Sequence, residues 1–191
     1  MTTDPPASSA TEKKKSGGQP SAAEEGASKY PDMEFGQDIH KLTVKAAGVD
    51  AEFQTKVFEK IVKELENPSL YKLLQTTLQV EAGILSDSEL LAMEAKNTKH
   101  AEELEAKVAE AQESAGDMEV QDARVEVARF AAKSLTKDEA LEAYKKLLDL
   151  PKISSGKKID ALMESSRVAS FYGDTTKSAE FVESVRPIYE E

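Results

Sequence analysis

Residues Asp117 to Pro151 read DMEVQDARVEVARFAAKSLTKDEALEAYKKLLDLP, and this stretch decides the fold class. It contains two segments in which apolar residues recur at three- and four-residue spacing, the mark of one helix face. These residues are Val120, Ala123, Val127, Phe130 and Ala131, then Ala140, Leu141, Tyr144, Leu147 and Leu148. Between the segments, Thr136 and Glu139 form a capping box, which marks a helix start, and Pro151 ends the second segment. The stretch therefore predicts two helices joined by a short turn.

The second of these helices has the pattern of a tetratricopeptide unit. Such a unit carries a small residue, an aromatic residue four positions later and an apolar residue three positions after that, and Ala140, Tyr144 and Leu147 follow this order. The first helix matches less well, because Arg124 and Val127 stand where a large aromatic residue and a leucine are typical. We expect the structural core of the hairpin to consist of Val127, Phe130, Ala140, Tyr144 and Leu147.

A second copy of the hairpin follows. One face of the next helix is expected from Ile159, Leu162, Met163, Ser166 and Ala169, and the face of the returning helix from Ala179, Val182, Val185 and Ile188. Ala140 and Ala179 occupy matching positions in the two copies. Stacked helical hairpins bury a continuous core. The sequence thus predicts an all-α, tetratricopeptide-like α-solenoid with hairpin 1 at 117–150 and hairpin 2 at 154–189.

The chain before the hairpins is expected to divide into three parts. Residues 1–31 are rich in Pro, Gly, Ser and Ala and contain no Leu, Ile, Val or Phe, so we expect a disordered tail. Residues 32–85 carry the periodicity of short N-terminal helices. Residues 86–115 begin with a Ser86/Glu89 capping box and contain no Pro or Gly, which predicts one long helix packed on its neighbours. Its expected seam is thin and interrupted by polar residues, with Leu90, Asn97, Leu104 and Ala111 recurring every seven residues. The expected helical-repeat domain is therefore 32–191.

Charge and composition exclude several classes of function. The chain has 191 residues, no cysteine, 36 acidic and 25 basic residues, and a net charge of −11. Phosphate backbones would repel such a protein, so we expect no nucleic-acid partner. The longest apolar runs are far shorter than the roughly 20 residues that span a bilayer, so we expect no membrane partner either.

A search for reactive groups yields no catalytic site. Neither of the two histidines, His40 and His100, lies near a nucleophile motif. The Glu-x-x-His pattern of helical di-metal sites is also missing, because Gln37 and Asn97 stand three residues before the histidines. Neither a phosphate loop nor a calcium loop is present. We expect no enzyme, no catalytic, cofactor-binding or metal-binding residues, no cofactor and no small-molecule substrate.

Residues 68–189 resemble a known family. The likeness rests on five groups of residues. These are Pro68 and Tyr71 in a proline-led helix, Asn97, Glu103 and Leu104 in a long Lys/Glu-rich helix, Asp122 and Ala123 at the entry to the first hairpin, Lys137 to Ala140 at the start of its second helix, and FYGD at Phe171 to Asp174. In this order they resemble the N-terminal helical-repeat part of the regulatory-particle non-ATPase subunit 7 family of the 26S proteasome lid, also called non-ATPase regulatory subunit 6. The resemblance implies a non-catalytic scaffold of ubiquitin-dependent degradation in cytoplasm and nucleus. Its implied partners are other lid subunits and the ATPase ring.

The chain departs from the family's pattern in two places. Leu135 and Thr136 replace the Gly-Asp of the first hairpin turn, and the winged-helix half of such subunits, the PCI module, is absent from the sequence. The first subunit of the COP9 signalosome shares the architecture and is the alternative assignment. An amphipathic lipid-binding protein and a metal-dependent bundle enzyme are two further alternatives, which vesicle-induced helicity and tightly bound metal would reveal.

Overall fold

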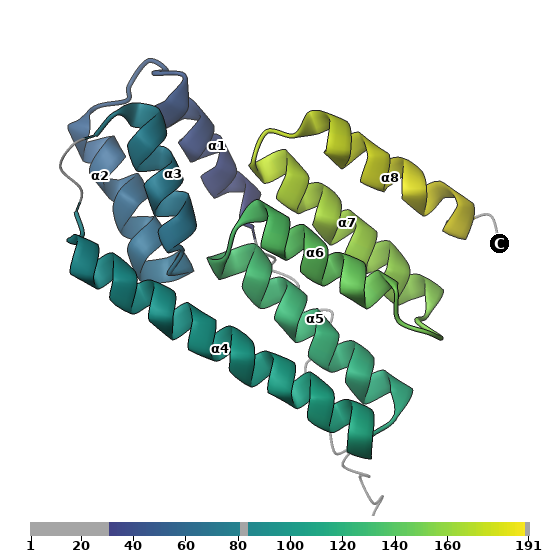
Figure 1. Ribbon diagram of the computed structural model, residues 1–191. Coiled ribbons are helices and arrows are strands. Elements are labelled where there is room, and N and C mark those ends of the chain that lie inside the picture. The colour runs from purple at the N-terminus through teal and green to yellow at the C-terminus, as the bar shows by residue number, and fades with distance from the viewer. Residues whose placement is uncertain (1–30, 81–83, 190–191) are drawn as a thin grey trace, which may run out of the picture.

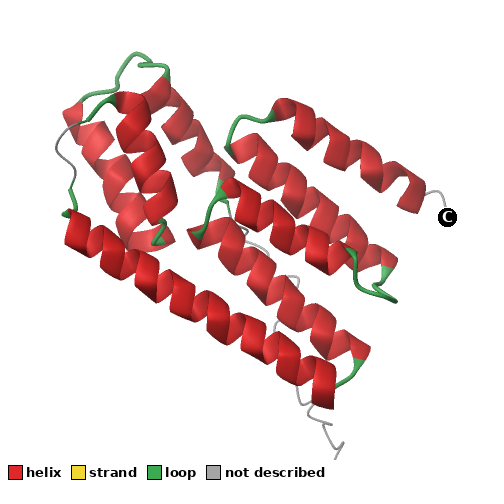
Figure 2. Cartoon of the chain, viewed as in Figure 1, coloured by secondary structure: helices red, strands yellow, loops and turns green. Residues whose placement is uncertain are grey.

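The computed structural model describes residues 31–80 and 84–189, and this part of the chain contains helices and no strand (Figure 2). The predicted all-α class is therefore confirmed. Figure 1 shows α1 to α3 as one bundle and α4 to α8 as a row of helices beside it. The predicted tail at 1–31 falls almost wholly outside the described residues.

The N-terminal bundle is formed by α1 (Met33–Thr43), α2 (Ala51–Lys60) and α3 (Pro68–Leu78). Asp32, Asp50 and Asn67 cap the three helices, each through a side-chain oxygen that accepts a backbone N–H of the first turn. The α2 helix continues into a π-helical turn, η2 (Ile61–Leu65), which the apolar periodicity did not reveal. Pro68 takes the first position of α3, where its missing N–H costs no hydrogen bond.

The long helix α4 runs from Asp87 to Ser114. It begins with the predicted capping box, in which Ser86 Oγ accepts the Glu89 N–H and the Glu89 carboxylate accepts the Ser86 N–H. Only a narrow line of its residues is buried: Leu90, Asn97, Leu104 and Val108. The first three recur every seven residues, so the predicted thin seam is the face on which α4 packs.

The two predicted hairpins are both present. Hairpin 1 consists of α5 (Asp117–Ser134) and α6 (Lys137–Leu148), and hairpin 2 of α7 (Ser155–Phe171) and α8 (Thr175–Tyr189). The predicted Thr136/Glu139 capping box opens α6, and Gly173, whose φ of +76° suits glycine, turns the chain between α7 and α8. The hairpins stack through an apolar core that α5, α6 and α7 share, and Lys157 of α7 also pairs with Asp122 of α5 at 2.6 Å.

The described residues form two apolar cores. The first joins α1, α2, η2 and α3 to Leu90 at the start of α4, and the second lies between α5, α6 and α7. Tyr172, just after α7, packs against both cores. The bundle and the hairpins are therefore in contact at the turn between α7 and α8 as well as through α4.

Candidate functional site

Four of the five residues predicted as the hairpin core, namely Val127, Ala140, Tyr144 and Leu147, lie in the apolar core that α5, α6 and α7 share. Ala140, Tyr144 and Leu147 are buried on α6, with at most 1% of their surface exposed. Val127 is half-buried on α5 and packs against the same cluster. That these side chains carry the stability of the hairpin stays a prediction, for which we give a test in the Discussion.

Phe130 lies differently from the expected position between the paired helices. Its side chain is half-buried, and its ring packs edge to face on His100 of α4, with 4.7 Å between ring centroids. The ring borders a hollow of about 340 Å³ between α4, α5 and α6. Phe130 therefore packs hairpin 1 on the long helix.

A buried carboxylate lies between the hairpins. No sequence pattern distinguishes it from the other residues among the 36 acidic ones. Glu164 of α7 is 5% exposed and accepts hydrogen bonds from Tyr144 Oη at 2.8 Å and from Arg129 Nη2 at 3.2 Å. Burial and the neighbouring Glu164 charge raise the pKa of Tyr144. The phenol therefore stays protonated and donates a hydrogen bond to Glu164, which links α5, α6 and α7.

Asn67 connects the N-terminal bundle to the turn of hairpin 1. Its Oδ1 caps α3 by accepting the Leu70 N–H at 2.8 Å, while its Nδ2 donates to Lys133 O at 3.1 Å and Leu135 O at 2.9 Å. The last carbonyls of a helix have no partner within the helix. The single buried amide of Asn67 thus forms hydrogen bonds with backbone groups at the start of α3 and at the end of α5.

Two further buried side chains continue this connection. Asn97 Nδ2 of α4 donates to Glu66 O at 2.7 Å and to Ser134 O at 3.2 Å, and Ser134 Oγ donates to Leu65 O at 2.8 Å. We call Asn67, Asn97 and Ser134 the polar clasp. Because each buried polar atom in it has a partner, the clasp fixes the bundle, α4 and hairpin 1 in one arrangement.

An aromatic contact joins the bundle to hairpin 2. Phe171 packs on Phe35 of α1, with ring centroids 6.5 Å apart, and on the following Tyr172 at 5.2 Å. A Cβ added at Gly36 would lie 3.0 Å from Phe171 Cδ2, so glycine leaves room for the ring inside a helix that would otherwise favour alanine. Burial raises the pKa of Tyr172 to about 12, and a hydrogen bond with Asn67 opposes this shift.

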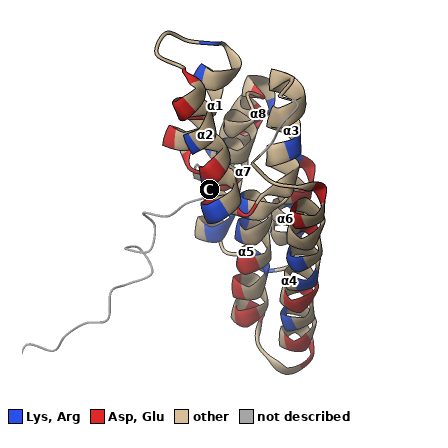
Figure 3. Cartoon of the chain, turned by 90° about the vertical axis from the view of Figure 1, so that its left-hand side faces the viewer, with Lys and Arg blue, Asp and Glu red and all other residues tan. Residues whose placement is uncertain are grey.

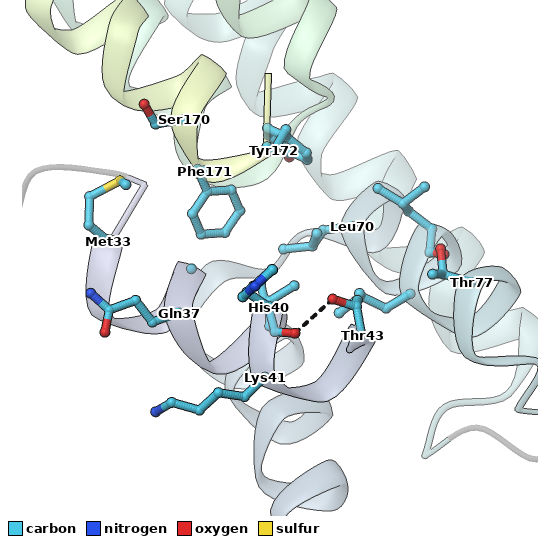
Figure 4. Close-up of a pocket in the computed structure, with 15 residues that line it drawn as sticks. Met33, Gln37, His40, Lys41, Thr43, Leu70, Thr77, Ser170, Phe171 and Tyr172 are labelled. Carbon is cyan, nitrogen blue, oxygen red and sulfur yellow. Dashed lines mark hydrogen bonds between the residues drawn. The ribbon is translucent and has the colours of Figure 1, made fainter. Parts of the chain in front are cut away.

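Beside this contact lies a hollow with a volume of about 560 Å³. Figure 4 shows Phe171 projecting from the end of α7 toward α1, which carries Gln37 and His40, with Leu70 on the other side. We call this hollow the α1–α3 groove. It is lined by Met33, Gly36, Gln37, Ile39, His40, Lys41, Thr43, Leu70, Leu73, Leu74, Thr77, Ser170, Phe171, Tyr172 and Gly173.

The charged side chains hold helices together instead of gathering into a reactive cluster. Acidic and basic positions are interspersed along α4 and α5 (Figure 3), and Arg124 of α5 pairs with Glu105 of α4 at 2.6 Å. In the described ranges no three His, Cys, Asp or Glu side chains come together as a metal site would require. His40 lies on α1 and His100 on α4, each exposed.

None of the helices in the described part of the chain is both long enough and apolar enough to cross a bilayer.

Comparison with known proteins identifies similar sequences. A family model described as 26S proteasome subunit RPN7 matches residues 87–191, which begin at the first residue of α4. The 26S proteasome non-ATPase regulatory subunit 6 of Caenorhabditis elegans is 25% identical over 171 residues, which cover 88% of the chain and 40% of the relative. The Arabidopsis thaliana homolog is 25% identical over 162 residues (85% and 38%), and the Dictyostelium discoideum protein 25% identical over 173 (88% and 42%). The chain thus spans about two fifths of the length of these relatives.

Proposed function

The chain belongs to the 26S proteasome subunit RPN7 family, whose model matches residues 87–191, and from this premise we propose that it is a non-catalytic scaffold of the proteasome lid. In this role it contributes to ubiquitin-dependent protein degradation by holding other subunits in place. Its partners are other lid subunits and the ATPase ring. It works in the cytoplasm and the nucleus, where we place the assembled particle.

The single observation that carries the proposal is the family match over the whole row of helices from α4 to α8. Three features of the described residues support it. The hairpins stack into an extended surface, buried polar side chains fix the arrangement of the helices, and large apolar side chains remain exposed on several helices, among them Leu73, Leu91 and Val182. An extended, rigid and partly apolar surface suits a protein that acts through contacts.

We also propose that the hairpins, the long helix and the N-terminal helices act as one unit, from residue 32 to 191. The polar clasp supports this division, because it crosses from the bundle to α4 and to hairpin 1. A unit that holds its own shape presents its contact surfaces without an ordering cost on assembly.

Affinity purification with quantitative mass spectrometry tests the proposal. The tagged chain is isolated under native conditions with ATP from cells that make it, and all recovered proteins are quantified. We expect the other subunits of the 26S proteasome in comparable molar amounts. Recovery of signalosome subunits in their place would favour the alternative assignment, and recovery of the chain by itself would contradict the scaffold role.

Depletion of the chain tests its role in degradation. If the chain holds the particle together, cells that lose it accumulate ubiquitin conjugates, and the assembled 26S particle declines on native gels. Unchanged conjugate levels together with a normal amount of assembled particle would contradict this part of the proposal.

A further inference from the structure

The α1–α3 groove has the shape of a binding groove for one more helix. Met33, Gln37 and His40 follow one another along α1 at spacings of four and three residues, so they form one ridge of that helix. Leu70, Leu73 and Thr77 form a second ridge on α3 at spacings of three and four. Each helix has 11 residues, about 16 Å at the usual rise of an α-helix. The two ridges thus border a trough about three helical turns long.

The floor of the groove is apolar, and one wall remains uncovered. Ile39, Leu70 and Leu74 are buried, whereas Leu73, between them in sequence on α3, is 50% exposed. A single exposed leucine is ordinary on a protein surface. Leu73, however, borders both this groove and an adjoining hollow of about 390 Å³ toward Lys137, so it stands between two hollows of the surface.

The charge of the groove is opposite to that of the chain as a whole. The protein has 36 acidic residues and a net charge of −11, yet none of the described residues that line the groove is Asp or Glu, and two of them are His40 and Lys41. Lys41 pairs with Asp38 of its own helix at 2.9 Å, and the Lys41 side chain is 53% exposed. Such an exposed pair is weak. Lys41 therefore remains able to meet a carboxylate that enters beside it.

We propose that the α1–α3 groove is the docking site for an amphipathic α-helix of a neighbouring proteasome subunit, whose apolar face covers Leu73 and whose flanking carboxylates meet Lys41 and His40. The identity of the neighbour as a proteasome subunit rests on the proposed function. The docked helix completes a bundle with α1 and α3, a recurring mode in which apolar side chains at helical spacing fill a groove between helices. Phe171 and Tyr172 close one end of the groove and set the register of the docked helix.

Residues 1–30 of this chain are a poor occupant. They contain no Leu, Ile, Val or Phe that could cover Leu73, although they carry acidic residues such as Glu24 and Glu25. A second copy of the chain would have to bring a helix whose apolar face is flanked by acids. The test below distinguishes these two occupants from a neighbouring subunit.

The experiment uses a photoreactive amino acid in the full-length chain. It is placed at position 73 and, as a matched control, at position 91, since Leu91 of α4 is 62% exposed and does not line the groove. Both chains are purified in the assembled particle and irradiated, and the cross-linked peptides are sequenced. We expect position 73 to cross-link to a helix of another proteasome subunit that has an apolar stripe flanked by Asp or Glu.

A synthetic peptide of the cross-linked helix then measures binding to the purified chain. Leu73→Asp should weaken binding about tenfold or more, because it places a charge in the apolar contact. Lys41→Glu should weaken it about fivefold, and Leu91→Asp should leave it unchanged. Circular dichroism of each variant shows that the helices remain folded.

Each other outcome overturns the proposal. Cross-links from position 73 to residues 1–30, to a second copy of this chain or to no protein would show that no neighbouring helix occupies the groove. Peptide binding that tolerates Leu73→Asp, or that improves in Lys41→Glu, would do the same. If the unmodified chain never enters the particle, it is the proposed function that fails, so the two failures are distinguishable.

Discussion

The returning helices of the two hairpins, α6 and α8, have comparable sequence patterns but different surroundings. Four residues of α6 are buried, namely Ala140, Ala143, Tyr144 and Leu147, whereas no described residue of α8 is buried. Ala140 and Ala179 stand at matching positions, and only Ala140 is covered. The α6 helix packs between α5 and α7, while α8 rests on α7.

The difference shows that the repeat pattern sets which face of a helix is apolar, and the neighbours decide how far that face is buried. The two turns differ in the same way. The carbonyls at the end of α5 accept hydrogen bonds from the buried polar clasp, whereas the turn before α8 is closed by Gly173 and by a partly exposed ion pair between Lys137 and Asp174 at 3.1 Å. Hairpin 1 should therefore contribute more to the stability of the chain than hairpin 2.

The largest effect is expected for Tyr144→Ala in α6. It removes a fully buried ring together with the hydrogen bond to Glu164, so we expect a loss of about 3–5 kcal/mol in the free energy of unfolding. Phe181→Ala, which truncates a half-buried ring on α8, is the matched control and should cost about 1–1.5 kcal/mol. Urea denaturation measures the free energy of unfolding of both variants. Equal losses would show that α6 and α8 contribute equally to stability.

A smaller loss is expected when the polar clasp is opened. Asn97→Ala leaves Glu66 O and Ser134 O buried without this donor, which should cost about 1–3 kcal/mol of unfolding free energy. Thr98→Ala, at the next and exposed position of α4, should change stability by less than about 0.5 kcal/mol. If Asn97→Ala is as mild as its neighbour, the turn of hairpin 1 does not depend on the clasp.

Phe130→Ala measures how much of hairpin 1 depends on the long helix. The half-buried position on His100 implies a loss of about 1–2 kcal/mol, below the cost of removing a fully buried phenylalanine. A double-mutant cycle with His100→Ala should give a coupling of about 0.5–1.5 kcal/mol if the two rings interact. Additive losses would show that Phe130 makes its contribution elsewhere.

The smallest effect is expected on α8. Val182 is 46% exposed, so Val182→Ala should change the free energy of unfolding of the isolated chain by less than about 0.5 kcal/mol. Leu147→Ala in the buried face of α6 should cost about 2–5 kcal/mol. Thermal unfolding of both variants decides the matter, and a large loss for Val182→Ala would mean that α8 is covered in solution.

The helices and their starts followed from the sequence because they depend on local chemistry. Periodic apolar residues placed α5 and α6, and the Thr136/Glu139 and Ser86/Glu89 pairs are capping boxes of α6 and α4, as predicted. The heptad positions of α4 identified its buried seam, including Asn97. These features are set within four to seven residues of each other, which is the range that a single sequence reveals.

The contacts between distant segments could not be predicted in the same way. Nothing near Glu164 distinguishes it from the exposed acids, because Tyr144 and Arg129 reach it from other helices. Asn97 was visible as a polar break in a seam, but its partners, Glu66 and Ser134, lie 31 and 37 residues away. Phe130 is a further example. The apolar periodicity placed it on one face of α5, but it did not show that this residue contacts α4.

The most direct test of the account is the size of the particle in which the chain travels. Lysate from cells that make the tagged chain is separated on a glycerol gradient with ATP, and the chain is followed alongside proteasomal peptidase activity. A proteasome scaffold is expected to move with the activity of the large particle. A chain that stays near its own mass of 20.8 kDa, while the particle moves normally, would contradict the account.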